Sequence, residues 1–355
     1  MGDTVRIGIV GAGNISGQYV KTLPRLDNVV ITRIADIDVS KAAALASQAG
    51  VPACTPDELH VASDVDIVLN LTIPLAHASV ALAAIAAGKH VYGEKPLAAD
   101  TIAAKSVLDA AAAAGVVIGC APDTVLGTGV QTARSSVDAG DIGVPVAATA
   151  FMTTPGHERW HPSPEFYYEP GGGPLLDMGP YYLTALVTLL GPVRRVVGMS
   201  SAPRATRVIG SGPREGTTFP VRVATHVTGV LEHVGGELST LMMSFDIWGA
   251  QLPRIEVYGT EGSLSVPDPN NFDGTVRIFR DDWVDLPVLG GYPGAGRGFG
   301  VADMARSIVD GTPHRTDGTL AYHVLDVMEC LLRAAETGTS VVIGSTCERP
   351  AAVTA

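Results

Sequence analysis

The chain has 355 residues, of which 46% are hydrophobic and 17% charged, and its formal net charge at pH 7 is −12. This length suits two domains that each bury an apolar core, and the composition excludes a disordered chain. The negative charge argues against a nucleic-acid backbone or an anionic membrane as partner, because both reward clustered lysines and arginines. The expected ligand is therefore a small molecule.

The cysteines and the apolar segments indicate the compartment. Cys54, Cys120, Cys330 and Cys347 are widely spaced and include no Cys-x-x-Cys pair, a pattern typical of thiols in a reducing compartment rather than of disulfides or a zinc site. No signal peptide precedes Val5, and no apolar run approaches the ~20 residues of a membrane-spanning helix. The sequence predicts a cytoplasmic protein with no metal site.

The first predicted element is a buried strand over residues 5–10, which runs into a glycine turn at 11–16 and then into a helix. Gly11 permits the tight turn, and Gly13 lets a pyrophosphate approach the backbone at the amino end of the helix. Ser16 stands at the third glycine position, where a small residue is sufficient for helix–strand packing. The predicted dinucleotide contacts of this turn are Gly11, Gly13, Asn14 and Ile15.

The next predicted strand, residues 29–36, ends in Asp36. A carboxylate at this spacing after the glycines accepts hydrogen bonds from the hydroxyls of the adenine ribose. Asp38 follows, and no Lys or Arg stands between Asp36 and Lys41, so the 2′-phosphate of NADP would meet repulsion. The expected cofactor is NAD, and NADP is disfavoured. The alternative is that Asp36 only caps the helix that opens near Ser40.

Strands and helices continue to alternate up to Cys120. The sequence predicts a doubly wound parallel sheet from this alternation, with Asp100 capping the start of one helix and Gly115 ending it. The expected strands are 65–71, 90–94 and 116–120, and the expected helices are 76–87 and 100–114.

After Asp123 the pattern changes to one helix followed by alternating strands, which predicts a second, mostly antiparallel domain. The expected domains are 1–123 and 124–355. The segments 203–220 and 287–300 are rich in Gly, Pro and Arg and are expected to be long loops. The expected helix is about 127–139, and the expected strands are 144–153, 221–231, 237–246 and 253–259.

The segment His90–Pro96 carries two ionisable side chains, Glu94 and Lys95, to the carboxyl end of a predicted strand. Ligands bind at this edge of an open parallel sheet. Pro96 ends the strand and restricts the backbone of Lys95, so the ammonium group is aimed in a defined direction. The alternative for this tripeptide is a solvated turn.

Three motifs occur in order along the chain. They are the glycine turn at 11–16, the segment Thr72-Ile73-Pro74-Leu75-Ala76-His77 followed by Gly88-Lys89-His90 and Glu94-Lys95-Pro96, and Gly171-Gly172-Gly173-Pro174-Leu175-Leu176-Asp177-Met178-Gly179-Pro180-Tyr181. Together they resemble the motifs of the glucose–fructose oxidoreductase, inositol dehydrogenase and rhizopine-catabolism (Gfo/Idh/MocA) oxidoreductases. The resemblance implies a dinucleotide-binding domain, followed by a substrate-binding α/β domain whose large open sheet assembles homodimers or homotetramers. It also implies cofactor contacts from Thr72, Ile73, Pro74, His77, Glu94 and Lys95.

Two positions depart from the family pattern. Leu75 replaces the usual asparagine, and Tyr181 replaces the usual histidine, although a minority of relatives also carry tyrosine there. Asp177 and Tyr181 lie one helical turn apart and face the same way. A carboxylate and a phenol beside the Lys95 ammonium can bind a vicinal diol and relay a proton. The alternative for Tyr181 is a core tyrosine in an apolar helix.

The resemblance implies an NAD-dependent dehydrogenase that oxidises a hydroxyl of a sugar, glycoside or cyclitol, with Lys95 as acid/base and Asp177 and Tyr181 as its partners. Trp160 and His161, in an aromatic loop, are expected to contact the substrate. One alternative is a reductase of a keto-sugar, or an enzyme that resembles dihydrodiol dehydrogenase. A further alternative is a dinucleotide-binding regulator without turnover.

Overall fold

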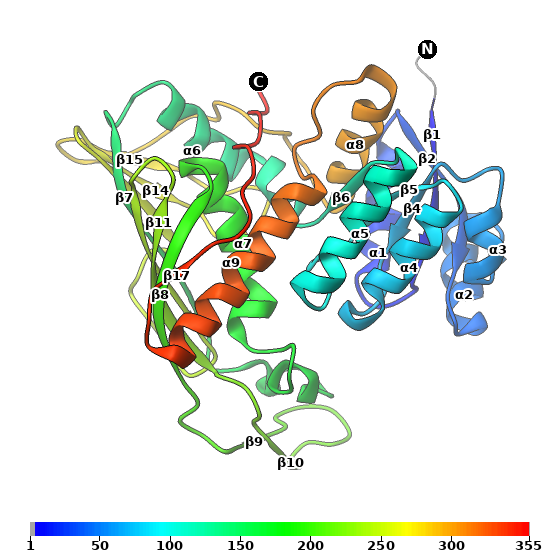
Figure 1. The fold of residues 1–355 in the computed structure, drawn as a ribbon, viewed down its shortest axis with the longest axis horizontal. Coiled ribbons are helices and arrows are strands. Elements are labelled where there is room, and N and C mark those ends of the chain that lie inside the picture. The colour runs from blue at the N-terminus through cyan, green and yellow to red at the C-terminus, as the bar shows by residue number, and fades with distance from the viewer. Residues whose placement is uncertain (1–3, 355) are drawn as a thin grey trace. The chain divides into compact units, whose positions relative to one another are not determined.

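The computed structural model describes residues 4–354, and the chain forms two compact units (Figure 1). Unit 1 consists of Met1–Gly127, Tyr292–Tyr322 and Pro350–Val353. Unit 2 consists of Thr128–Gly291, His323–Arg349 and Thr354–Ala355. The expected division after Asp123 stays a prediction about functional domains, whereas these compact units interleave along the chain.

Unit 1 is built on a parallel sheet of six strands in the order β3-β2-β1-β4-β5-β6. This confirms the predicted doubly wound fold, with the short strand β3 as an addition that the sequence did not predict. The strands are β1 (Val5–Val10), β2 (Val29–Ala35), β3 (Ala53–Cys54), β4 (Ile67–Asn70), β5 (His90–Gly93) and β6 (Ile118–Cys120). The helices are α1 (Ser16–Thr22), α2 (Val39–Ala49), α3 (Pro56–Val61), α4 (Pro74–Ala86), α5 (Thr101–Ala114) and α8 (Phe299–Asp310), with the 3₁₀ turns η1 (Leu23–Arg25) and η2 (Asp123–Leu126).

Local side-chain chemistry sets where these helices begin and end. The Asp100 side chain accepts a hydrogen bond from the Ala103 N–H, and Gly115 adopts the left-handed conformation after α5, as predicted. Asp38 caps α2 by accepting from the N–H groups of Ser40 and Lys41. The core under the sheet includes strand residues such as Ile7, Ile9, Ile67 and Leu69, and it is completed by α8 through Val301, Ala302, Met304 and Ala305.

Unit 2 is built on a mixed sheet of nine strands in the order β16-β15-β14-β13-β7-β12-β11-β8-β17. Every pairing is antiparallel except that of β7 with β12, so the sheet is mostly antiparallel, as predicted. The strands are β7 (Pro145–Thr153), β8 (Val193–Ser201), β11 (His226–His233), β12 (Leu238–Ser244), β13 (Ile255–Gly259), β14 (Ser263–Val266), β15 (Arg277–Phe279), β16 (Trp283–Asp285) and β17 (Val341–Val342). The helices are α6 (Thr128–Asp138), α7 (Pro174–Leu190) and α9 (Gly318–Thr337), with the turns η3 (His157–Arg159) and η4 (Glu165–Tyr168); α9 belongs to unit 2 from His323 onward.

Helices cover one face of the nine-stranded sheet (Figure 1). Helix α7 packs on β7, β11 and β12. Gly198 and Gly229 pair across β8 and β11, and a Cβ at either position would lie 2.6 or 2.5 Å from Cδ1 of Leu331 in α9. Two glycines therefore make room for one leucine, which lets α9 lie close against the sheet.

Part of unit 2 differs from the expected elements. The segment 203–220 contains a small hairpin of β9 (Thr206–Val208) and β10 (Thr218–Pro220). The strand expected at 221–231 begins only at His226, because the Val221 and Arg222 N–H groups donate to the carbonyls of Ala205 and Tyr168 instead of a sheet ladder. Alternation of apolar residues alone did not reveal these loop pairings.

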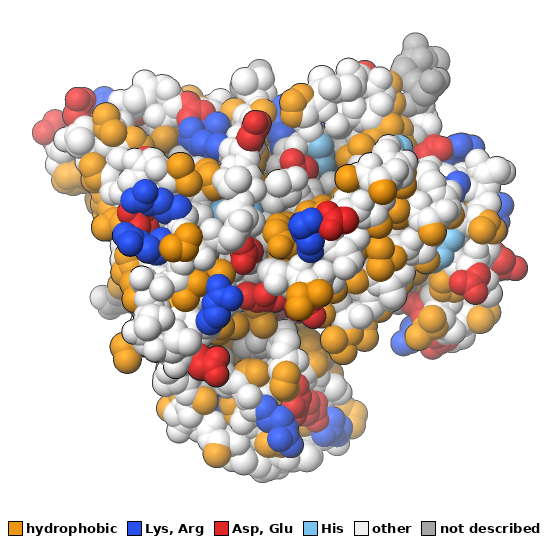
Figure 2. Space-filling model, in the orientation of Figure 1, with side chains coloured by type: hydrophobic (Ala, Val, Ile, Leu, Met, Phe, Trp, Pro, Cys, Tyr) orange, Lys and Arg blue, Asp and Glu red, His pale blue; other side chains and the backbone are white. Residues whose placement is uncertain are grey.

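On the face shown in Figure 2, Lys and Arg side chains lie in small groups with Asp and Glu beside them. Arg194 and Arg195, for example, both pair with Glu232. Such a distribution does not form the basic stripe that follows a nucleic-acid backbone. Within residues 4–354, every helix is too short or too polar to cross a membrane.

Candidate active site

Gly11 shapes the turn that follows β1. Its φ is +105°, and a Cβ there would lie 2.7 Å from the backbone C and O of Leu71 at the end of β4. Its N–H donates to the Ala35 carbonyl at the end of β2 (2.8 Å). Only glycine combines this φ with this close approach, so the predicted role of Gly11 in the tight turn agrees with its geometry.

Gly13 lies exposed on the same turn, with open space where a side chain would begin. A Cβ there would meet no atom within 4 Å among the described residues. Below it, the buried Ser16 hydroxyl donates to the Gly13 carbonyl (2.6 Å), so this side chain holds the turn from inside. The turn therefore has the room beside its backbone that a pyrophosphate requires.

Asp36 lies next to the glycine turn. Its Oδ2 accepts from the Ala12 N–H (2.7 Å) and its Oδ1 from the Asp38 N–H (2.8 Å). Asp38, not Asp36, caps the following helix, so the alternative role considered for Asp36 does not hold. Each carboxylate oxygen can accept a second hydrogen bond, and the half-buried Asp36 retains that capacity toward ribose hydroxyls.

The segment after β4 is fastened by two buried side chains. Thr72 Oγ1 donates to Asn70 Oδ1 (2.6 Å), and Asn70 Nδ2 donates to the His77 carbonyl (3.0 Å). The His77 ring is 2% exposed, with Nδ1 2.6 Å from the Pro96 carbonyl and Nε2 3.0 Å from the Thr72 carbonyl. Burial lowers the pKa of this imidazole. His77 thus connects the two segments that carry Thr72 and Lys95, while Ile73 and Pro74 stay exposed.

Glu94 holds the backbone from which Lys95 projects. The buried Tyr19 hydroxyl donates to Glu94 Oε1 (2.8 Å), and the Lys95 N–H donates to Glu94 Oε2 (3.1 Å). Burial raises the pKa of Tyr19 well above its ordinary value, which keeps the phenol protonated as a donor. The Glu94 carboxylate is thereby turned inward, and the half-buried Lys95 lies at the carboxyl end of β5.

In unit 2, α7 carries the other two predicted catalytic residues. Asp177 lies in the first turn of the helix and Tyr181 one turn later. The Asp177 carboxylate lies 3.0 Å, through Oδ2, from His157 Nε2. Tyr181 is 7% exposed, so most of its side chain is buried.

His157 is a site residue that the sequence did not reveal. Its Nδ1 is buried and makes no hydrogen bond with any residue in the range 4–354. A ring that carries its hydrogen on Nε2 donates to Asp177 and leaves a lone pair, rather than an N–H, at the buried nitrogen. This tautomer fits the environment best. No helical spacing links residues 157 and 177, and His157 lies on the short turn η3, so no sequence signal pointed to the pair.

The His157 ring is surrounded by aromatic side chains, including Phe245 at 4.4 Å and Tyr167 at 4.7 Å between ring centroids. Trp160 packs on it at 5.3 Å and is 58% exposed. His161, half-buried, accepts a hydrogen bond at Nδ1 from the Ser163 N–H (3.1 Å). The structure therefore brings Asp177 and the predicted substrate contact Trp160 together through His157.

Family models match both parts of the chain. The model described as "Oxidoreductase family, NAD-binding Rossmann fold" matches residues 5–121. The model described as "GFO/IDH/MocA C-terminal domain" matches residues 130–265. The two models are separated by a short junction, and the residues after 265 lie outside both matches.

Individual relatives agree with these matches. The 1,5-anhydro-D-fructose reductase of Ensifer adhaerens is 29% identical over 266 residues, 73% of this chain and 74% of the reductase. A protein named D-xylose 1-dehydrogenase (NADP(+)) 2, of Haloferax volcanii, is 27% identical over 94% of this chain and 98% of its own length. A solved structure, levoglucosan dehydrogenase in complex with NADH, has the same fold, with a TM-score of 0.82 at 20% identity over 97% of this chain and 100% of that one. The chain belongs to the Gfo/Idh/MocA family, and it is an NAD(P)-dependent oxidoreductase.

Proposed function

We propose that the enzyme is an NAD-dependent dehydrogenase that oxidises a hydroxyl of a sugar, glycoside or cyclitol, with Lys95 as the acid/base. The observation that carries this proposal is the support given to Lys95, whose backbone is fixed by the buried Tyr19–Glu94 pair. A proton-transfer group is effective only when its geometry is held near the reacting atom. The nicotinamide, when bound, supplies the hydride acceptor.

Asp177 and Tyr181 complete the proposed catalytic set. Because His157 holds Oδ2 of Asp177, the carboxylate has a defined orientation from which it can accept a hydrogen bond from a substrate hydroxyl. Tyr181 carries a phenol one turn further along the same helix face, where it orients the alcohol or relays its proton. Trp160, exposed beside His157, offers an aromatic face to the apolar side of a sugar ring, with His161 next to it.

Two other functions remain as alternatives. The first is reduction of a keto-sugar, or the reaction of an enzyme that resembles dihydrodiol dehydrogenase. The same residues serve both directions because hydride transfer is reversible, and the names of the relatives include both a reductase and a dehydrogenase. A regulator without turnover would need the dinucleotide turn but not Lys95, Asp177 and Tyr181 together. The presence of all three therefore favours catalysis.

The first prediction concerns the glycine turn. Gly13→Ala adds a methyl group in space that no described residue occupies, so its clash should be with the bound pyrophosphate alone. We expect NAD affinity to fall by roughly tenfold or more, about 1.4 kcal/mol, with an unchanged melting temperature. Titration of NAD by intrinsic fluorescence measures the first effect and thermal unfolding the second.

Gly17→Ala is the matched control, because a Cβ there also meets no atom within 4 Å among the described residues. It should leave NAD binding unchanged. Equal affinities for wild type and Gly13→Ala would show that the dinucleotide does not approach this turn.

The second prediction concerns cofactor preference. Asp36 and Asp38 surround the place where the adenine ribose is expected, and Lys41 pairs with Asp38 (3.8 Å), which reduces its attraction for a 2′-phosphate. The dissociation constant of NADP should exceed that of NAD by about tenfold or more, a difference in binding free energy of about 1.4 kcal/mol. Asp36→Ala should reduce this difference because it weakens the binding of NAD. Parallel titrations with both dinucleotides measure it, and equal dissociation constants in the wild type would contradict the proposal.

The third prediction concerns Lys95. Lys95→Ala should lower kcat by roughly 10²- to 10⁴-fold, the range for loss of a positioned proton-transfer group, while NAD affinity changes far less. The pH profile of kcat/KM should lose a limb that the wild type shows. Before these variants are compared, a substrate is identified by screening the wild type and NAD against a panel of polyols and glycosides. The readout of the screen is the absorbance of the reduced cofactor. Lys105→Ala, an exposed lysine on α5, is the control.

Tyr181→Phe then separates the two roles of the phenol, because it keeps the ring and removes only the hydroxyl. A loss comparable to that of Lys95→Ala would make Tyr181 the direct proton donor, and a small loss would leave it orienting the substrate. Near wild-type turnover of Lys95→Ala with an unchanged pH profile would instead refute Lys95 as the acid/base.

The fourth prediction is that the enzyme is a homodimer or homotetramer assembled through the open sheet. Val197 and Val230 pair across β8 and β11 and are both exposed, and Met199, on the same face, is 74% exposed. Leu238 continues this row of apolar side chains on β12. An apolar face of this kind is typical of an interface between copies.

Light scattering at micromolar concentration should therefore give a multiple of the 36.6 kDa chain mass. Met199→Glu should shift the mass toward that of the monomer, because it places a charge in the apolar face. Ile102→Glu, an equally exposed apolar position on α5, should not. A monomeric wild type would end the proposal.

A further inference from the structure

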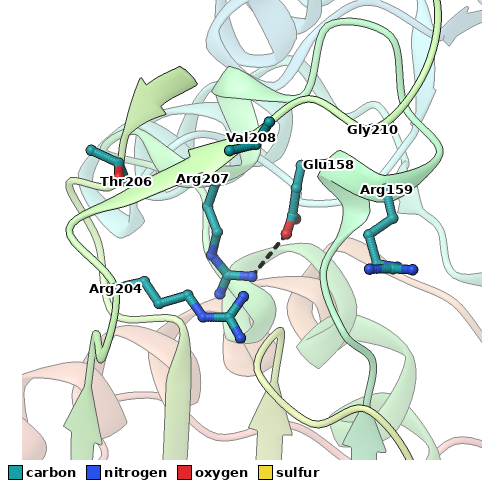
Figure 3. A pocket seen from close by; sticks show the side chains of 7 residues that line it. All are labelled: Glu158, Arg159, Arg204, Thr206, Arg207, Val208 and Gly210. Atoms are coloured by element: carbon teal, nitrogen blue, oxygen red, sulfur yellow. Dashed lines mark hydrogen bonds and ion pairs between the residues drawn. The ribbon is translucent and has the colours of Figure 1, made fainter. Parts of the chain in front are cut away.

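Unit 2 contains a cavity with a volume of about 500 Å³ that the proposed function does not use. It lies between turn η3 and the β9 segment, and the Gly210 N–H donates to the Glu158 carbonyl (2.8 Å), which fastens these two segments to each other. Figure 3 shows the side chains directed around this space. The lining residues are Glu158, Arg159, Arg204, Thr206, Arg207, Val208 and Gly210.

The lining is basic although the chain as a whole is acidic. Three arginines and one glutamate line the cavity, whereas the whole chain carries a net charge of −12. Arg207, buried, donates to Glu158 Oε1 (2.9 Å) and also pairs with Asp246. The two carboxylates that balance Arg207 leave the charges of Arg159 and Arg204 without compensation from acidic side chains of the lining.

Arg159 and Arg204 differ from most arginines of this unit. Arg214 pairs with Glu165 and Arg222 with Glu169, but neither Arg159 nor Arg204 has a carboxylate partner within the described part of the chain. The Arg159 guanidinium instead stacks on the Trp248 ring, with its Cζ 4.3 Å from the ring centroid. Stacking fixes the plane of the group and leaves its N–H edges available for an anion.

Arg207 contributes to the wall of the cavity through a side chain that is 1% exposed and whose Nε is closed to solvent. The guanidinium groups that an anion can reach are therefore those of Arg159 and Arg204, which are exposed.

We propose that this cavity binds a phosphoryl oxyanion, either as free phosphate or as the phosphate group of a sugar-sized molecule. Guanidinium groups form paired hydrogen bonds with phosphate oxygens, and the guanidinium groups of Arg159 and Arg204 are not engaged by any carboxylate of the described residues. The cavity volume of about 500 Å³ exceeds that of the bare ion and falls in the range of small-molecule sites. The acidic chain as a whole disfavours nucleic acid and anionic lipid as sources of that phosphate.

The site is distinct in position from the catalytic residues of unit 2 but shares a turn with them. His157 of η3 holds Asp177, and the next two residues, Glu158 and Arg159, line the cavity. Because these three residues are consecutive, an anion held by Arg159 contacts the same turn that positions the Asp177 carboxylate. Binding is measured without turnover, so the proposal stands or fails independently of the dehydrogenase activity.

The test is calorimetric titration of the full chain with inorganic phosphate at constant ionic strength, with saturating NADH present to occupy the dinucleotide turn without supplying an oxidant. Arg204→Gln removes the exposed charge without touching the buried Arg207 cluster, and it should weaken phosphate binding by roughly tenfold or more. Arg159→Gln should act in the same direction. Arg277→Gln is the matched control, because this exposed arginine pairs with Asp285 away from the cavity lining.

A second arm distinguishes the two sources of phosphate. Glucose 6-phosphate and glucose are titrated in the same way. Tighter binding of the sugar phosphate than of phosphate, lost in Arg204→Gln, assigns the site to a phosphorylated small molecule, and equal binding assigns it to the free ion. Absence of phosphate and sugar phosphate binding in the wild type, or equal binding by all four proteins, would overturn the proposal.

Discussion

The close approach of Gly11 to the end of β4 is the constraint on which unit 1 depends. A backbone with φ of +105° that lies against Leu71 and bonds to Ala35 brings the carboxyl ends of β1, β2 and β4 to one place. The Asp36 carboxylate then bonds to the Ala12 N–H beside it. The glycine turn, Asp36 and Thr72, which are predicted to contact the dinucleotide, follow the carboxyl ends of these three strands.

One carboxylate in each unit is supported in a similar way. Glu94, which fixes the backbone of Lys95, is held by the hydroxyl of the buried Tyr19, and Asp177 is held by the ring of the buried His157. In each case the carboxylate bonds to a ring side chain that is itself fixed by packing, and this support sets the orientation of the carboxylate.

The sequence was sufficient for those features whose cause lies within a few residues. Gly11, the Asp100 cap and the apolar strands around Ile7 and Ile67 follow from local conformational preference and periodicity. It was not sufficient where the cause is distant. His157 meets Asp177 at a separation of 20 residues in the sequence, and Gly198 and Gly229 are explained by Leu331, which lies far along the chain. The late start of β11 likewise depends on loop carbonyls that no alternation pattern encodes.

The interleaved order of the two units affects how the protein is made. Asp123, fully buried, accepts hydrogen bonds from the N–H groups of Gly298 and Gly300, and α8 supplies Met304 to the core around β1. A ribosome synthesises all of the unit 2 sheet strands except β17 before it reaches these residues. The core of the dinucleotide-binding unit therefore becomes complete only after the strands from β7 to β16 of unit 2 have been synthesised.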